Sequence, residues 1–159
     1  MRIVLVFVGK TDEEYIKEGC KKYFDRLSNY MKVEEFIVLP PKSIYTYKPA
    51  EIKMKEGEEL IKALSKMDRA FVVLLDEQGK EYSSVDFSKY MNKIFSQSYD
   101  KLVFVVGGGY GFSEDVYKKY PQKISLSKLT FTHQMIRLLL VEQIYRAMTI
   151  LKNEKYHHL

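Results

Sequence analysis

Short apolar runs alternate with amphipathic stretches along most of the chain. Residues 2–8 form a run rich in Val and Ile that predicts a strand, and residues 13–28 predict a helix with Asp12 as its candidate N-cap. Further strands are predicted at residues 33–39, 70–75, 101–106 and 123–126, and further helices at residues 50–66, 84–96 and 113–119. Ser83 and Ser84 are the candidate N-caps of the helix that ends near residue 96. The polar, proline-bearing segment from residue 40 to residue 49 is predicted to be a loop.

This alternation predicts an α/β fold. The run at residues 70–75 carries no charge, which is typical of a strand buried on both faces of a mostly parallel sheet with helices on both faces. No internal repeat or linker separates a second domain, so residues 1–159 are expected to form one domain. Ligands of such sheets bind where the strands end, and the candidate loops follow Val8, Leu75 and Val106.

Two of these loops carry glycine and polar residues. The stretch VVGGGYGF has glycines at 107, 108, 109 and 111, but it matches no dinucleotide fingerprint because Phe112 replaces the last glycine, and it lacks the Gly-Lys-Ser/Thr of a P-loop. It is either a tight turn or a turn that contacts a ligand. Asp76 and Glu77 in LLDEQGK either cap a turn or form a pocket wall.

The C-terminal stretch, residues 126–150, joins a polar loop to a helix that is apolar around nearly its whole circumference. Such a helix is buried on more than one side, and part of it is expected to pack against a second copy of the chain. Arg137 lies among apolar residues and needs a carbonyl or anionic partner, either structural or on a ligand. His133 is either a satisfied polar residue or a ligand contact. Glu142 and Arg146 have the spacing of a helix-surface ion pair.

Composition narrows the class of protein. The chain is 46% hydrophobic and 30% charged, as in globular proteins, and its net charge of +5 weakly favours an anionic partner such as RNA. The single cysteine, Cys20, excludes an intramolecular disulfide, and neither a signal peptide nor a membrane span is visible, so a cytoplasmic protein without membrane contact is expected. The three histidines lack metal-ligand spacing, and no metal site or Ser-His-Asp nucleophile is expected.

Six stretches occur in a characteristic order: VFVGK, KEGEELIKAL, LLDEQGK, FVVGGGYGF, SLSKLTFTHQMIRLLLVEQIYRAM and the terminal KYH. With them the chain resembles the ribosomal RNA large-subunit methyltransferase H family of the SPOUT superfamily along essentially its whole length. The resemblance implies a C-terminal trefoil knot, a rare exception to unknotted folds, and a homodimer through the last helix. It further implies S-adenosyl-L-methionine as methyl donor. The implied acceptor is N3 of a pseudouridine in the helix 69 loop of 23S large-subunit rRNA within the assembled 70S ribosome.

The resemblance also implies residue roles. Arg137 would stabilise the developing anion or hold a phosphate, and His133 would face donor and RNA. Tyr156 and His157 would complete the site from the partner chain, with His157 as a candidate proton acceptor. The implied donor contacts are Leu75, Gly107, Leu126, Ser127, Lys128, Leu129, Thr130 and Phe131.

Two departures from the family pattern leave questions open. Thr132 stands where the family usually has Pro, and the ending YHHL does not decide whether His157 or His158 faces the site. Two alternatives are a SPOUT methyltransferase that acts on tRNA and a non-catalytic RNA- or ribosome-binding protein. The second is suggested by the basic charge and by 13 tyrosines able to stack on bases.

Overall fold

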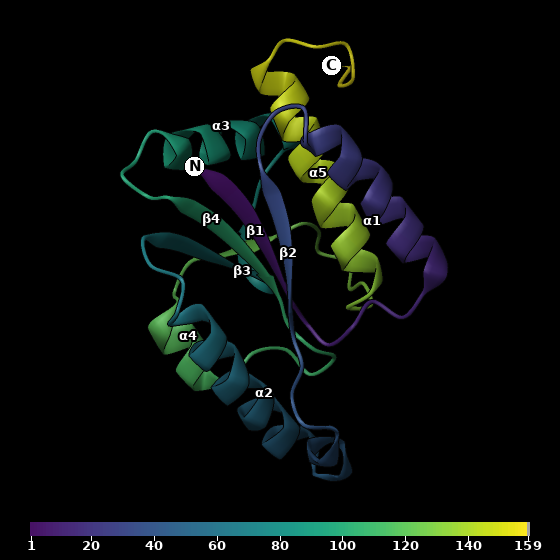
Figure 1. The fold of residues 1–159 in the computed structure, drawn as a ribbon, viewed down its shortest axis with the longest axis vertical. Coiled ribbons are helices and arrows are strands. Elements are labelled where there is room, and N and C mark those ends of the chain that lie inside the picture. Colours follow the sequence, from purple (N-terminus) through teal and green to yellow (C-terminus); the bar gives the residue numbers. More distant parts are fainter. Residues whose placement is uncertain (159) are drawn as a thin grey trace.

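The computed structural model, which describes residues 1–158, is built on a five-stranded sheet of order β2-β1-β4-β3-β5 (Figure 1). Every pair of neighbouring strands is parallel. The predicted α/β fold with a parallel sheet is therefore confirmed. The strands are β1 (Arg2–Val8), β2 (Val33–Val38), β3 (Ala70–Glu81), β4 (Lys101–Val106) and β5 (Lys123–Ser125).

Helices cover both faces of this sheet, as predicted. The α-helices are α1 (Glu14–Leu27), α2 (Pro49–Leu64), α3 (Ser84–Phe95), α4 (Glu114–Lys119) and α5 (Met135–Leu151). Helices α1, α3 and α5 share one hydrophobic core with one face of the sheet, and α2 and α4 share a second core with the other face (Figure 1). Alternate side chains of β1 feed the two cores, since Ile3 and Leu5 belong to the first and Val4 and Val6 to the second.

Helix starts agree only in part with the sequence prediction. Ser83 caps α3 as predicted, because its Oγ accepts a hydrogen bond from the Asp86 N–H at 3.0 Å. The predicted cap Asp12 is wrong, since Glu13 holds the N-cap position of α1 without a side-chain hydrogen bond. The backbone N–H of Asp12 instead donates to Gln134 Oε1 at 2.9 Å, and so joins the loop after β1 to the start of α5.

Two segments differ from their predicted structure. The loop predicted at residues 40–49 contains a 3-10 helix, η1 (Lys42–Thr46), which is fixed by the buried side chain of Ile44. Strand β3 continues beyond Leu75 to Glu81, because Lys80 and Glu81 pair with β5 after a register shift. Charged residues are tolerated there because this extension pairs with β5 alone.

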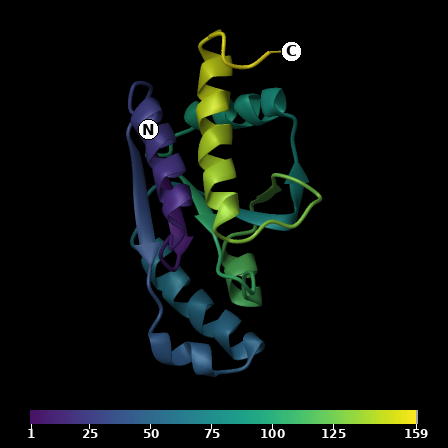
Figure 2. The ribbon, with the colours of Figure 1, turned by 90° about the vertical axis from the view of Figure 1, so that its right-hand side faces the viewer.

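Helix α5 packs against both α1 and α3 (Figure 2). It begins at Met135, so His133 lies just before the helix rather than within it. One side of α5 is fully buried and includes Leu140, Val141 and Ile144. The remaining apolar side chains of the helix are only half-buried within the single chain, including Ile136, Leu139 and Ile150.

Candidate functional site

A cavity of about 420 Å³ lies at the carboxyl end of the sheet. It is framed by β3 at the point where its pairing with β4 ends, by the end of β4 and by the segment after β5, whereas the candidate loop after Val8 does not line it. The volume falls within the range of small-molecule and cofactor sites. The lining residues are Lys53, Leu75, Asp76, Glu77, Gln78, Val106, Gly107, Gly108, Gly109, Tyr110, Gly111, Phe112, Tyr117, Ile124, Ser125, Leu126, Ser127, Leu129, Thr130, Phe131, His133 and Ile136.

The glycines after β4 form a tight turn that is also a cavity wall. The N–H of Gly111 donates to the carbonyl oxygen of Gly108 at 3.1 Å, and Gly111 has a φ of +78°, which a residue with a side chain rarely adopts. Gly108 packs directly against the carboxylate of Glu56 from α2, leaving no room for a Cβ. The predicted tight turn is therefore present and its glycines line the cavity, while the predicted contact with a ligand stays a prediction.

The part of β3 just beyond its pairing with β4 supplies the acidic side of the cavity. Asp76 Oδ1 accepts a hydrogen bond from the Gln78 N–H at 2.8 Å, and its other carboxylate oxygen accepts one from the Tyr117 hydroxyl. The buried, negatively charged setting raises the pKa of Tyr117, so its hydroxyl stays protonated and keeps donating at neutral pH. Asp76 thus accepts a local backbone hydrogen bond, and both Asp76 and Glu77 line the cavity.

The segment after β5 closes the cavity. The Ser125 Oγ donates to the Ser127 carbonyl oxygen at 2.8 Å, and the Leu129 N–H donates to the Ser127 Oγ at 3.0 Å, so serine side chains shape this loop. Of the predicted donor contacts, all but one line the cavity; Lys128 does not. Leu129 nevertheless leaves 73% of its surface exposed, so this wall is open toward solvent.

His133 lines the cavity next to the glycine turn. Its Nδ1 would lie 3.8 Å from a Cβ placed on Gly109. His133 is exposed overall, but partial desolvation of its ring lowers the pKa of the imidazole, and the positive charge of Arg137 lowers it further, against an opposing effect of Asp12. The ring is thereby favoured in its neutral form, in which one nitrogen accepts and the other donates a hydrogen bond.

Arg137 lies away from this cavity. It is fully buried and donates to the carbonyl oxygen of Val8 at 2.8 Å and to Thr11 Oγ1 at 2.9 Å, while its guanidinium lies 4.8 Å from the ring centroid of Phe7. The predicted carbonyl partner thus exists, but it belongs to the same chain rather than to a neighbouring subunit. These hydrogen bonds connect α5 to β1 and to the loop after it, and Arg137 has no exposed surface in the described chain.

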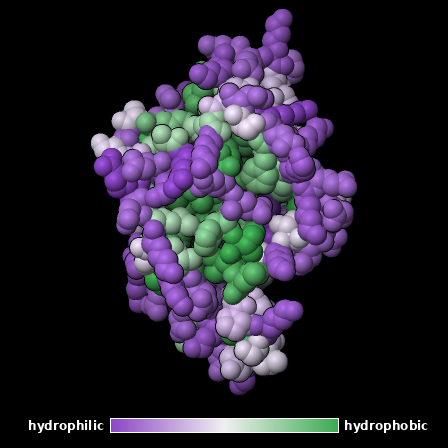
Figure 3. Space-filling model, viewed as in Figure 1, coloured by the Kyte–Doolittle hydropathy of each residue, from purple (hydrophilic) through white to green (hydrophobic). Residues whose placement is uncertain are grey.

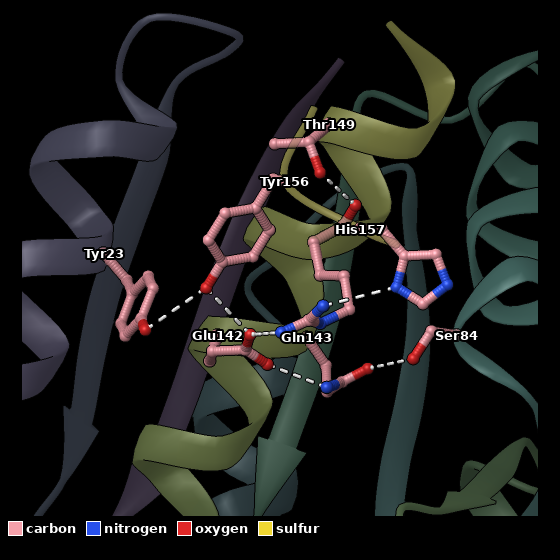
Figure 4. Close-up of polar contacts among 8 residues, drawn as sticks. Tyr23, Ser84, Glu142, Gln143, Thr149, Tyr156 and His157 are labelled. Atoms are coloured by element: carbon pink, nitrogen blue, oxygen red, sulfur yellow. Dashed lines mark hydrogen bonds and ion pairs between the residues drawn. The ribbon is translucent and has the colours of Figure 1, made fainter. Parts of the chain in front are cut away.

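A second polar cluster forms at the other end of α5, where Tyr156 and His157 fold back on the helix (Figure 4). Glu142 accepts hydrogen bonds from Arg146 at 2.5 Å and from the Tyr156 hydroxyl at 3.0 Å. Arg146 lies 3.3 Å from His157 Nδ1 and 4.7 Å from the ring centroid of Tyr156. None of these four residues lines the cavity that holds His133.

Sequence reasoning missed several members of the two clusters. Arg146 was interpreted only as the partner of Glu142, an ion pair that is confirmed, yet Arg146 also holds His157. Its spacing of eleven residues from His157 carries no periodic signal. Lys53 of α2 and Tyr117 of α4 also line the cavity, from the face of the sheet opposite to α5. Their approach to the cavity depends on the three-dimensional fold and has no signal in the sequence.

The described residues 1–158 hold no group of three or more potential metal-ligating side chains. Within the same part of the chain, no helix has the length and apolar character needed to cross a membrane.

Comparison with known proteins places these features in a family. The family model described as "Predicted SPOUT methyltransferase" matches residues 1–157. The chain is 52% identical to the ribosomal RNA large subunit methyltransferase H of Parabacteroides distasonis and 50% identical to that of Christiangramia forsetii, and each match covers 99% of both chains.

Solved structures add a likeness of fold. The tRNA (m1G37) methyltransferase from Aquifex aeolicus is similar over 100% of this chain and 75% of its own, with a TM-score of 0.53 and 16% identity. At such low identity the likeness concerns the fold alone, whereas the family model covers nearly every residue. With its parallel sheet and the cavity at the carboxyl ends of β3 and β4, the chain belongs to the SPOUT methyltransferase family.

Proposed function

We propose that this protein is an S-adenosyl-L-methionine-dependent methyltransferase that modifies large-subunit ribosomal RNA. The observation that carries the proposal is the cavity at the sheet edge, in a chain 52% identical over its length to a ribosomal RNA large subunit methyltransferase H. A related fold, the ribosomal RNA small subunit methyltransferase E from Neisseria gonorrhoeae, has been solved with S-adenosyl methionine bound. That structure has a TM-score of 0.50 and 13% identity, so it supports the fold alone. The proposal of a donor site in this chain is therefore based on the cavity itself.

The lining of the cavity suits an adenosyl sulfonium. Apolar side chains of Leu75, Val106 and Leu126 offer a slot for a flat base, and the peptide groups of the glycine turn offer hydrogen bonds at its rim. The carboxylates of Asp76 and Glu77 favour a positively charged ligand over a neutral one. We assign the donor contacts to Leu75, Gly107 and the segment 126–131, with Lys128 as the one member whose side chain lies off the cavity.

The proposed acceptor is N3 of a pseudouridine in the helix 69 loop of 23S rRNA, on 70S ribosomes in the cytoplasm. N3 loses its proton and attacks the sulfonium methyl in line, so that an N–C bond forms as the S–C bond breaks and a neutral thioether leaves. The donor is already electrophilic, and the protein must mainly align the reactants and accept one proton. The candidate acceptors of that proton are neutral His133 at the cavity and His157 in the C-terminal tail, which is the segment 152–158 after α5.

A homodimer would bring the polar cluster around His157 of one chain next to the cavity that holds His133 of the other chain. Residues 135 and 146 lie eleven positions apart on α5, or about 17 Å along the helix, so one chain keeps the tail away from its own cavity. Half-buried side chains form a stripe along α5 at helical spacing: Ile136, Leu139, Gln143, Arg146 and Ile150. A two-fold contact along this stripe sets Arg146 of one protomer opposite Ile136 of the other, and Ile136 lines the cavity.

Two measurements test the proposed function. Titration calorimetry should show one donor bound per chain, and mass mapping of 23S rRNA from a strain lacking the gene should show the loss of one methyl group that the restored gene returns. A protein that binds ribosomes but gives no heat with the donor would instead be a non-catalytic binding protein. A methyl group lost from tRNA rather than from rRNA would make the acceptor wrong while leaving the enzyme class intact.

A further inference from the structure

A basic segment protrudes next to the cavity. Residues 40–55 contain Lys42, Lys48, Lys53 and Lys55 against the single acid Glu51, a net charge of +3 from 4 − 1, whereas the whole chain of 159 residues carries +5. Among the described residues, the side chains of the first three lysines take part in no ion pair, and only Lys55 is paired, with Glu58 at 3.2 Å. The positive charge of this segment is therefore not neutralised by the rest of the fold.

Large apolar and aromatic side chains are exposed among these lysines. Tyr45 is 48% exposed and Tyr47 49%, while the neighbouring Leu39 and Met54 are 57% and 55% exposed. In Figure 3 the lower tip of the molecule, formed by η1 and the start of α2, is a mixture of pale and hydrophilic residues, with apolar surface above it. Aromatic rings interleaved with unpaired lysines are typical of surfaces that bind single-stranded nucleic acid, where bases stack and phosphates meet cations.

The protruding segment is held in a fixed shape. Ile44 is 4% exposed and inserts into the body, and the Tyr45 hydroxyl donates to Glu56 Oε1 at 3.0 Å. The 3-10 turn is closed by the Ile44 N–H to Pro41 carbonyl bond at 3.1 Å and the Tyr47 N–H to Ile44 carbonyl bond at 3.0 Å. A surface that is ordered before binding loses less conformational entropy when a partner docks.

The same contacts connect the segment to the cavity. Glu56, which holds Tyr45, also packs against Gly108 in the glycine turn, and its Oε2 is buried without a hydrogen-bond partner. Lys53, one turn before Glu56 on α2, lines the cavity itself. A polymer that crosses the segment would therefore meet Lys53 at the cavity edge without leaving the protein surface.

We propose that Lys42, Tyr45, Tyr47, Lys48 and Lys53, here called the lysine–tyrosine arm, bind the RNA substrate beside the nucleotide that is methylated. Phosphates contact the lysines, and unpaired bases stack on the exposed tyrosine rings. The proposal rests on the proposed function, because it assumes an RNA acceptor. It assigns the arm to RNA rather than to a second protomer, since the arm lies on η1 and α2 and carries unpaired positive charge, while the half-buried stripe lies on α5.

The test is a charge reversal with a control that makes the same change of charge at the opposite end of α2. The variant Lys42→Glu/Lys48→Glu alters the arm, and Lys62→Glu/Lys66→Glu makes the same change of net charge at exposed positions near the far end of α2. Methylation is measured on ribosomes from a strain lacking the gene, across a series of KCl concentrations, together with donor affinity by calorimetry. For the arm variant we expect KM for ribosomes to rise about tenfold or more and the salt dependence of log KM to lose roughly two units of slope.

A second pair of variants separates stacking from folding. Tyr47→Ala should raise KM for ribosomes severalfold, while Tyr47→Phe, which keeps the ring, should restore it; donor affinity should be unchanged in both. An arm variant with wild-type KM and salt slope would overturn the proposal, and so would a change of oligomeric state that accounts for the loss, because the arm would then join copies of the chain. If the wild-type protein methylates no RNA, the proposed function fails, whereas an active enzyme that is insensitive to arm charge refutes the arm alone.

Discussion

At the scale of single residues, the neighbours Gln134 and Arg137 share one task at the start of α5. Gln134 accepts from the Asp12 N–H and donates to the Lys10 carbonyl oxygen at 3.0 Å, while Arg137 donates to Val8 and Thr11. Four hydrogen bonds thus fix the loop after β1 to the segment that carries His133. Arg137 acts in this arrangement as a positioning residue for the cavity wall.

Replacing Arg137 should mainly lower the free energy of unfolding, because its side chain holds α5 to the chain around the end of β1. Arg137→Ala removes two hydrogen bonds from a charged donor and leaves a cavity in a fully buried site, so we expect the free energy of unfolding to fall by about 3 kcal/mol. Urea denaturation measures this loss. Lys89→Ala, at a side chain that is 71% exposed, is the control and should change it by less than about 0.5 kcal/mol. A fully stable Arg137→Ala protein that has lost methyl transfer would instead support a direct catalytic role.

His133 gives a pH dependence of defined sign. Its pKa in the folded chain is lowered by partial desolvation and by Arg137, relative to about 6.5 in an unfolded chain. The unfolded state then binds the proton more tightly, so the contribution to stability is complete above that pH and is lost as the pH falls toward the folded-state pKa. NMR titration should locate the His133 pKa below 6.5, and wild type should lose stability relative to His133→Gln as the solution is acidified. A normal or raised pKa would contradict this assignment.

The sequence predicted several of the residues that line the cavity, because the segments around Leu75, Gly107 and Leu126 follow apolar runs that are recognisable as strands. The role of Arg137 in the site stays a prediction: the residue does not line the cavity, and a buried arginine among apolar residues looks the same in the sequence whether its partner is a ligand or a backbone carbonyl. The role of Arg146 was hidden for a related reason, because its second partner, His157, reaches it only when the tail folds back.

At the scale of elements, the extension of β3 is the feature that shapes the cavity. A Cβ on Gly79 would lie 2.6 Å from both the N and the Cα of Ile124, so only glycine lets β5 approach β3 at this point. Periodicity ended the strand at Leu75, since DEQGKE has the composition of a turn. The pairing of this polar ribbon with the three-residue strand β5 depends on tertiary contacts and could not be predicted from either segment alone.

Gly79→Ala should therefore displace β5 and the loop that follows it. We expect the donor dissociation constant to rise by about tenfold or more, because Leu126 and its neighbours form one wall of the cavity. Titration calorimetry measures the change, and Lys80→Ala, at the next residue of the strand, which is exposed and does not line the cavity, serves as the control. Unchanged donor binding in Gly79→Ala would show that β5 does not position the donor site.

At the scale of the whole molecule, the proposed homodimer would bring the cluster around His157 next to the cavity of the other chain. Gly109→Trp should fill the cavity, since space is open beside Gly109, and His157→Ala should disable the tail cluster. Each variant alone is expected to be inactive. If the tail acts on the partner's cavity, dimers formed from an equal mixture should regain about a quarter of wild-type activity, since half are mixed and each of these has one intact site. Activity that stays at zero on mixing would show that each chain uses its own tail.

The fold class and the two-sided cover of the sheet followed from the sequence, because strands and helices alternate in distinct periods. The order β2-β1-β4-β3-β5 did not, since apolar strands of similar length carry no signal that pairs β1 with β4. The same limit applies to the stripe on α5, whose half-buried state depends on how far α1 and α3 cover the helix.

The position of β5 at the edge of the sheet has a consequence for synthesis on the ribosome. Four strands are complete once residue 106 has emerged, so most of the sheet can pair while the chain is still growing. The cavity, however, takes one wall from residues 124–136. A nascent chain therefore lacks a complete cavity until its last quarter has been made, and the same final segment contains the helix that carries the half-buried stripe.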